Sequence, residues 1–227
     1  MTRLKQILGQ TVAPGAPALA PTAALVLALA LALVLVPAPW QPARAEPSGR
    51  AAGLPAPAMP PAGAGQTRAR QERLDRLFAE LAQPDQPDWQ RIEDQIWAEW
   101  SHSGSDSMDL LLERGLEAID QGNYDAAIEH LSALVDHAPD FAEGWNARAT
   151  AYYRAGLYGP SVSDIAHVLE LNPRHFGALM GLGAILNELG YKKDALKAFR
   201  AAQRLHPHST DIKTAIERLE SELGRNL

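Results

Sequence analysis

The chain has 227 residues, with 27 acidic against 21 basic side chains, a formal net charge of −6 and no cysteine. The missing cysteine excludes disulfide bonds, thiol catalysis and thiolate metal sites, and an acidic balance without a basic, aromatic-rich patch argues against nucleic-acid binding. Because 11 of the 17 prolines lie in the first 66 residues, the part of the chain able to form a packed core begins after them.

The N-terminus has the three parts of a secretory signal peptide. Arg3 and Lys5 make a short positive region, residues 23–36 are an uncharged apolar run, and an Ala-Arg-Ala sequence ends at Ala45. A membrane-spanning helix usually needs about 20 apolar residues, more than this run contains. We therefore expect residues 1–45 to be a signal peptide cleaved near Ala45, which would leave a periplasmic or secreted protein of formal charge −9. An inner-membrane anchor facing the periplasm is the alternative.

A linker and a pair of helices are predicted next. Residues 46–66 are rich in proline, alanine and glycine and too poor in large apolar residues to fold, so we expect a disordered linker. Residues 67–107 then show apolar side chains at helical spacing on both sides of Pro84 and Pro87. The two apolar faces are Leu74, Leu77, Phe78 and Leu81, and Trp89, Ile92, Ile96, Trp97 and Trp100. We expect a helical hairpin, followed by a flexible joint over residues 101–107.

Two roles are open for this hairpin, which does not keep the register of the repeats that follow it. We expect its apolar faces to cover the exposed end of the first repeat, as an N-terminal cap. The alternative is an interface with another molecule through Trp97 and Trp100, because tryptophan is enriched at binding hot spots.

Glycine and proline recur with one period of 34 residues in the second half of the chain. The two series are Gly122, Gly156 and Gly190, and Pro139, Pro173 and Pro207. A fixed period of this length is typical of stacked helix–turn–helix units. Each of the windows 108–141, 142–175 and 176–209 therefore predicts a helix A, a glycine turn, a helix B and a proline turn.

Small residues also recur at fixed positions, counted from the first residue of each window. Position 8 holds Gly115, Ala149 and Gly183, and position 20 holds Ala127, Ser161 and Ala195. With proline at position 32, this pattern resembles the tetratricopeptide repeat (TPR), and residues 142–173 match it closely. The resemblance covers nearly half of the chain. It implies an all-α fold in which three units form a right-handed superhelical array. The order of signal peptide, linker and short TPR array resembles that of small exported TPR proteins of Gram-negative bacteria.

The end of the array and one internal ion pair are also predicted. After residue 209 an apolar stripe continues through Ile212, Ile216, Leu219 and Leu223. Glu217 falls at the position that must be small for another unit to follow, so residues 210–227 are predicted to include a C-terminal capping helix. Within the array, Arg148 stands at position 7, which is often leucine in the family, and Asp164 is its candidate partner.

No motif for catalysis or metal binding stands out. The histidines lack zinc-site spacing, and His137, His175 and His206 fall at or just past the end of a helix B, where the helix dipole favours positive charge. There is no glycine-rich phosphate loop and no Ser/His/Asp arrangement. We therefore expect a protein that is not an enzyme and holds neither cofactor nor metal.

The TPR resemblance places positions 2, 5, 9, 12 and 13 of each helix A on a concave groove. The predicted partner-binding residues are Asp109, Leu112, Leu116, Glu143, Asn146, Thr150, Tyr153, Arg154, Met180, Asn187 and Glu188. The amide, hydroxyl, aromatic and cationic groups of the second unit suit an extended peptide. The Lys/Asn/Arg set with which eukaryotic chaperone-binding TPRs grip a terminal carboxylate is absent from the matching positions.

We therefore predict a periplasmic adaptor that binds a peptide segment of another cell-envelope protein. The alternative is a membrane-anchored structural protein that self-associates through its tryptophan-rich hairpin.

Overall fold

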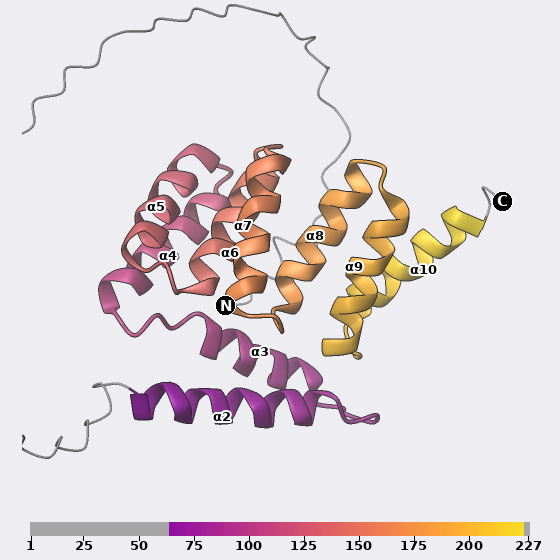
Figure 1. Cartoon of the computed structure of the whole chain (residues 1–227), viewed down its shortest axis with the longest axis horizontal. Coiled ribbons are helices and arrows are strands. Elements are labelled where there is room, and N and C mark those ends of the chain that lie inside the picture. Colours follow the sequence, from indigo (N-terminus) through magenta and orange to yellow (C-terminus); the bar gives the residue numbers. More distant parts are fainter. Residues whose placement is uncertain (1–63, 225–227) are drawn as a thin grey trace, which may run out of the picture. The chain divides into compact units, whose positions relative to one another are not determined.

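The computed structural model describes residues 64–224, and the predicted signal peptide and most of the predicted linker lie outside this range (Figure 1). Within it the chain forms nine helices and no strand. They are α2 (Ala64–Leu81), α3 (Trp89–Trp100), α4 (Asp106–Asp120), α5 (Tyr124–His137), α6 (Ala142–Arg154), α7 (Tyr158–Leu171), α8 (Phe176–Glu188), α9 (Lys192–Leu205) and α10 (Thr210–Gly224). Helix α2 begins inside the predicted linker. None of the helices in this part combines the length and apolarity that crossing a bilayer requires.

The pairs α4/α5, α6/α7 and α8/α9 are the three predicted helix–turn–helix units. Two residues past the end of each A helix stand Gly122, Gly156 and Gly190, whose φ angles are +73°, +76° and +82°. A side chain costs roughly 1–2 kcal/mol in this left-handed conformation, which explains why glycine keeps the 34-residue period.

Position 8 must be small because a large side chain of helix B packs against it. A methyl group added to Gly115 would lie 2.5 Å from Leu131, and one added to Gly183 would lie 2.8 Å from Phe199. Leu131 and Phe199 both occupy position 24 of their units. The predicted close approach of helices A and B is therefore confirmed in the first and third units.

The predicted pair of Arg148 and Asp164 forms between α6 and α7. Arg148 donates from Nε to Asp164 Oδ2 at 2.8 Å and from Nη2 to Oδ1 at 2.9 Å, and its guanidinium lies 4.8 Å from the Trp145 ring centroid. Hydrogen bonding to Asp164 raises the pKa of Arg148, while burial opposes the rise. This bidentate ion pair holds helix A of the second unit against its helix B.

Helix α10 is the predicted cap. Ile212, Ile216 and Leu219 are buried in one hydrophobic cluster with Phe199 of α9. Glu217 is exposed on the opposite face, so α10 ends the array with a polar surface.

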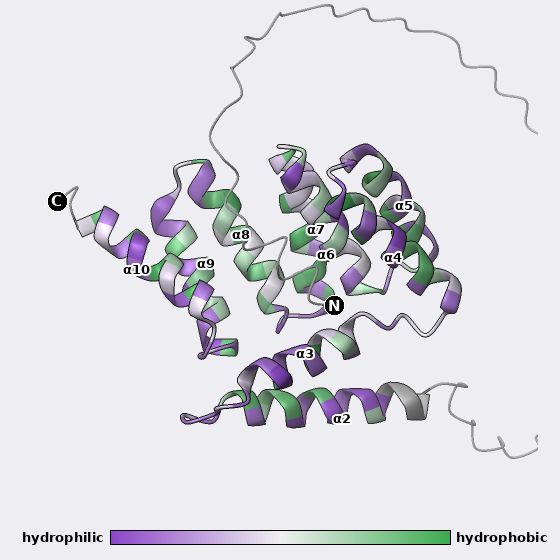
Figure 2. Ribbon diagram, turned by 180° about the vertical axis from the view of Figure 1, so that it is seen from behind, coloured by the Kyte–Doolittle hydropathy of each residue, from purple (hydrophilic) through white to green (hydrophobic). Residues whose placement is uncertain are grey.

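The α2–α3 hairpin forms as predicted but does not cover the first unit. Its apolar face joins the hydrophobic cluster of the third unit through Phe176, and Arg174 pairs with Asp75 at 2.6 Å. Figures 1 and 2, seen from opposite sides, both show α3 beside the ends of α8 and α9, and Figure 2 shows mixed hydrophobic and hydrophilic residues along α2. The outer face of α4 has little apolar surface for a cap to bury, since Leu110 lies there among exposed charged residues such as Glu113.

Candidate partner-binding groove

The predicted groove residues lie on α4, α6 and α8, the first helices of the three units. The structure does not expose them equally. Leu112, Glu143, Asn146 and Thr150 are buried, Glu188 is exposed, and Asp109, Leu116, Tyr153, Arg154, Met180 and Asn187 are half-buried.

On α4 the predicted groove residues have structural partners. The Asp109 carboxylate accepts hydrogen bonds from Ser103 N at 2.8 Å and Ser103 Oγ at 2.6 Å, and its other oxygen lies 2.9 Å from His102 Nδ1. Burial raises the pKa of Asp109. The hydrogen bonds from Ser103 and His102 and the charge of His102 together lower it by more, so the net shift of the pKa is downward. Leu112 belongs to the core between α4 and α5. The joint that we expected to be flexible is thus held by Asp109.

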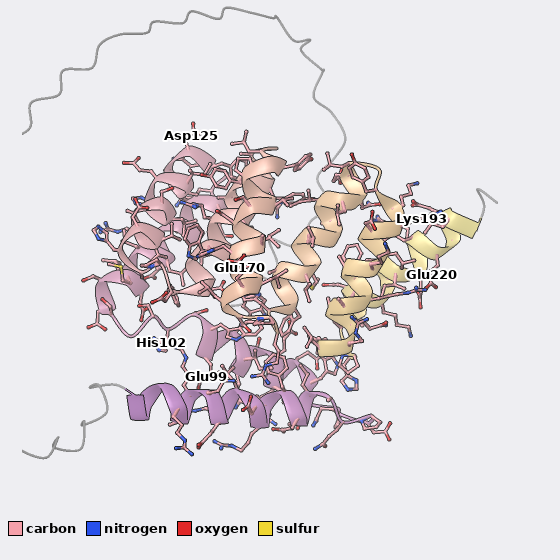
Figure 3. All side chains as sticks on the ribbon, viewed as in Figure 1. Glu99, His102, Asp125, Glu170, Lys193 and Glu220 are labelled. Carbon is pink, nitrogen blue, oxygen red and sulfur yellow. The ribbon has the colours of Figure 1, made fainter. Side chains whose placement is uncertain are left out.

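Helix α2 is held to the same joint. Arg73 Nη1 lies 3.2 Å from Glu99 Oε1, and Arg70 donates to the backbone carbonyls of Glu99 and His102. Glu99 and His102 are labelled in Figure 3, where α3 leads into α4. These contacts hold α2 against the end of α3 and the start of the joint.

On α6 a buried polar network replaces the predicted open surface. Glu143 Oε1 accepts from Asn146 Nδ2 at 3.2 Å, and Glu143 Oε2 lies 3.0 Å from His175 Nε2. His175 Nδ1 accepts from Ala178 N at 3.1 Å, so the ring proton is on Nε2 and is donated to Glu143. Thr150 Oγ1 donates to the Asn146 carbonyl at 3.0 Å. We expected His175 at or just past the end of a helix B, where it would serve that helix's dipole; it lies past the end of α7 and caps the start of α8.

The hairpin tryptophans cover this network. The Trp100 ring stacks on His175 with 4.3 Å between centroids and 17° between planes, and Trp97 meets Phe176 edge-on at 5.6 Å. A methyl group on Gly177 would lie 2.6 Å from Trp97 Cη2. Trp97 and Trp100 are only 3% and 7% exposed, so they form an interface inside the chain and are not available on the surface for self-association.

We call His175, Phe176 and Gly177 the tryptophan seat. Gly177 occupies position 2 of the third unit, a groove position that our sequence reasoning left out. A glycine at a groove position was the available signal, because glycine in a helix often marks a close approach.

A half-buried acid, Glu93, also links the hairpin to the array. Glu93 Oε1 accepts from Trp97 Nε1 at 3.3 Å, and Glu93 Oε2 lies 3.3 Å from His206 Nε2. This last contact has the distance of an ion pair without hydrogen-bond geometry. His206, which we expected to serve the dipole of α9, is 1% exposed and lies under the hairpin against Trp89.

A cleft of about 380 Å³ lies between the hairpin and the turns that precede α6 and α8. Phe78 and Trp100 form its aromatic walls, and Arg70, Arg174 and Asp140 bring charge. Its volume is that of a site for a small ligand or a few side chains of a peptide.

The other end of the groove is less buried, with Glu188 exposed and Tyr153, Arg154 and Asn187 half-buried. We call Tyr153, Arg154, Asn187 and Glu188, at the C-terminal ends of α6 and α8, the open end. Burial raises the pKa of Tyr153, and the negative charge of Glu188 adds to the rise while Arg154 opposes it. The Tyr153 hydroxyl therefore remains a hydrogen-bond donor between a cation and an anion. Among the described residues, no three His, Asp or Glu side chains are placed to hold a metal ion.

Comparison with known proteins agrees with this architecture. The family model described as tetratricopeptide repeat matches residues 112–159 and 161–210. A TPR repeat-containing protein of Rhizobium etli is 38% identical over 156 residues, which cover 68% of this chain and 76% of that protein. The SGT1 homolog of Bos taurus is 30% identical over 105 residues, which are 46% of this chain and 31% of that protein.

Two solved structures share the fold of the array. The first TPR of Spaghetti (RPAP3), bound to the HSP90 peptide SRMEEVD, is 25% identical with a TM-score of 0.51 and aligns with 53% of this chain and 98% of its own. The Sgt2 TPR domain of Aspergillus fumigatus is 20% identical with a TM-score of 0.51, over 54% of this chain and 82% of its own.

Proposed function

This chain belongs to the tetratricopeptide repeat family, and we propose that it is a non-catalytic adaptor of the cell envelope that binds a peptide segment of another protein in its groove. The observation that carries the proposal is the tryptophan seat, where groove residues already hold an aromatic side chain of a helix against Gly177. The RPAP3 domain, which holds an HSP90 peptide, supports peptide binding by a related array.

The open end is where we propose that a partner segment first binds. The Tyr153 hydroxyl can donate to a peptide carbonyl, and the Arg154 guanidinium can bind a carboxylate. Asn187 can both donate to and accept from a peptide backbone, and Glu188 can attract a basic side chain. A segment that carries both signs of charge fits these four groups better than a purely acidic tail.

We also propose that the adaptor acts in the periplasm, after cleavage near Ala45. The charged start and the apolar run of residues 23–36 support this location. N-terminal sequencing of the protein isolated from its native host tests it. A mature protein that starts near Glu46 is the expected result, and one that starts at Met1 or Thr2 would contradict export with cleavage.

Crosslinking capture from the envelope fraction tests the groove. We compare the wild-type chain with the Tyr153→Ala/Arg154→Ala variant. The matched control is Tyr191→Ala/Lys193→Ala, which removes the same kinds of side chain from the exposed turn before α9 and the start of that helix. The partner segment is then synthesised and titrated against all three proteins.

We expect the groove variant to bind the segment at least about tenfold more weakly, which corresponds to roughly 1.4 kcal/mol. The control should bind like the wild type. Equal affinity of all three proteins would remove the open end from the site, and failure to capture any specific segment would argue against the adaptor function.

A further inference from the structure

We propose that the α2–α3 hairpin is a displaceable occupant of the groove, and that the partner which replaces it is an amphipathic helix with two large aromatic residues three positions apart. This inference rests on the proposed function, since it names the partner class and the regulation of the same groove. In this proposal the tryptophan seat, which the hairpin covers, binds the aromatic residues of the partner helix.

The tryptophan seat is specific for this chemistry. Gly177 leaves room for the far edge of the Trp97 ring, and His175 presents its ring face to Trp100. A smaller aliphatic side chain would leave the backbone of Gly177 uncovered. The seat therefore selects two aromatic rings from one helix face, at positions i and i+3.

A third contact defines the partner helix further. Glu93 precedes Trp97 by one helical turn and brings a carboxylate to within 3.3 Å of the buried His206 ring. Both ring nitrogens of His206 are buried without a hydrogen-bond partner in the described part of the chain, so a replacing helix that lacked the acid would place no polar group beside them. The partner class is thus an acid, then an aromatic residue four positions later, then a second aromatic residue after three more.

The array has much of its core without the hairpin, which makes release possible. The hydrophobic clusters centred on Leu131 and on Ile185 contain no hairpin residue. The rim contacts of the hairpin are polar and water can replace them, as between Arg174 and Asp75 or between His208 Nε2 and the Gln83 carbonyl at 2.8 Å. The apolar cover lost when the hairpin leaves is that of the cluster around Phe176, which also includes residues of α9 and α10.

The cleft gives a partner a place to begin the exchange. Trp100, His175 and Glu143 all line it, so an incoming side chain can reach the stacked pair before the hairpin has left. Because the hairpin is tethered, its effective concentration at the seat is on the order of millimolar. A free helix of the same sequence must therefore be in large excess to compete with it in the wild-type chain.

The experiment uses a fluorescein-labelled synthetic peptide of residues 88–101, titrated by fluorescence anisotropy. The proteins are the full-length wild type, the Trp97→Ala/Trp100→Ala variant and the Arg174→Ala/His208→Ala variant, which loosens only the rim. We expect the tryptophan variant to bind the peptide at least about tenfold more tightly than the wild type does, with the rim variant between them. A peptide with both tryptophans replaced by alanine should bind none of the three.

Two controls keep the test decisive. Adding Gly177→Ala to the tryptophan variant should abolish peptide binding, because it closes the seat. Helix content measured by circular dichroism identifies a variant that has lost its fold. If the tryptophan variant has done so, the peptide affinity of the rim variant is compared with that of the wild type instead. Equal binding by the wild type and the released variants, or no binding by any of them, would overturn the proposal, as would binding that Gly177→Ala leaves unchanged.

The test is independent of partner capture. If capture at the open end succeeds and peptide exchange fails, the hairpin is a permanent part of the fold and this inference is wrong. If exchange succeeds and capture fails, the hairpin is displaceable but the proposed adaptor function is wrong.

Discussion

The contact between Trp97 and Gly177 predicts opposite effects of the same substitution at two glycines of α8. Gly177→Ala places a methyl group 2.6 Å from Trp97 Cη2 and 3.0 Å from its Cζ2. Gly181→Ala, one helical turn later, places its methyl group at an ordinary 3.5 Å from Ile165 Cδ1. Trp97 is enclosed by aromatic neighbours, including Phe176, and cannot swing aside without leaving the seat.

The magnitudes follow from two opposing effects. Alanine in place of glycine favours a helix by roughly 0.5–1 kcal/mol at either position. Overpacking a closed site costs about 1–3 kcal/mol, and only Gly177 incurs this cost. We therefore expect Gly181→Ala to raise the free energy of unfolding by about 0.5–1 kcal/mol and Gly177→Ala to lower it by roughly 0.5–2 kcal/mol.

Urea unfolding followed by circular dichroism at 222 nm and by tryptophan emission measures both changes. A difference of 1 kcal/mol should also move the Tm by about 2–4 °C for a domain of this size. The emission of folded Gly177→Ala should shift to the red, because Trp97 gains contact with water. If Gly177→Ala were as stable as Gly181→Ala and had wild-type emission, the docking of Trp97 on α8 would be refuted.

Three further substitutions test the array. Asp164→Ala leaves the half-buried Arg148 without its buried partner and should cost about 2–4 kcal/mol of unfolding free energy; a loss below 1 kcal/mol would contradict a structural role for the pair. Gly156→Ala should cost roughly 1 kcal/mol through its left-handed φ alone, whereas Gly159→Ala, also in open space, should not. The pKa of Asp109 is lowered by folding, so its contribution to stability is complete above the unfolded value near 3.8 and is lost as pH falls through the lower folded value. The stability difference between wild type and Asp109→Asn should therefore shrink in this acid range, and a difference that is constant with pH would contradict it.

The repeats were predictable because their determinants are local. A glycine that ends each helix A and a small residue that faces position 24 recur wherever the same backbone geometry recurs, as Gly156 and Gly183 show. The ion pair between Arg148 and Asp164 could also be predicted, because the two residues lie on paired helices of one unit.

The position of the hairpin could not be predicted in the same way. Periodicity shows that Trp97 and Trp100 share an apolar face, but not which of several apolar surfaces receives them. That choice depends on the fit between Trp97 and Gly177, which are far apart in the sequence. The burial of Glu143 could not be predicted for the same reason. Its groove position follows from the repeat, but its burial depends on His175, in the turn between α7 and α8, and on Trp100, which stacks on His175.

Spin-label distances test most directly whether the hairpin is docked on the array in solution. The chain has no cysteine, so the pair Gln90→Cys and Ser163→Cys, at exposed positions of α3 and α7, can be labelled without background. Pulsed double electron–electron resonance on the full-length protein should give one narrow distance distribution, which broadens when Trp97→Ala/Trp100→Ala is added. A broad distribution in the otherwise wild-type chain would show that the hairpin does not occupy the groove and would contradict this account.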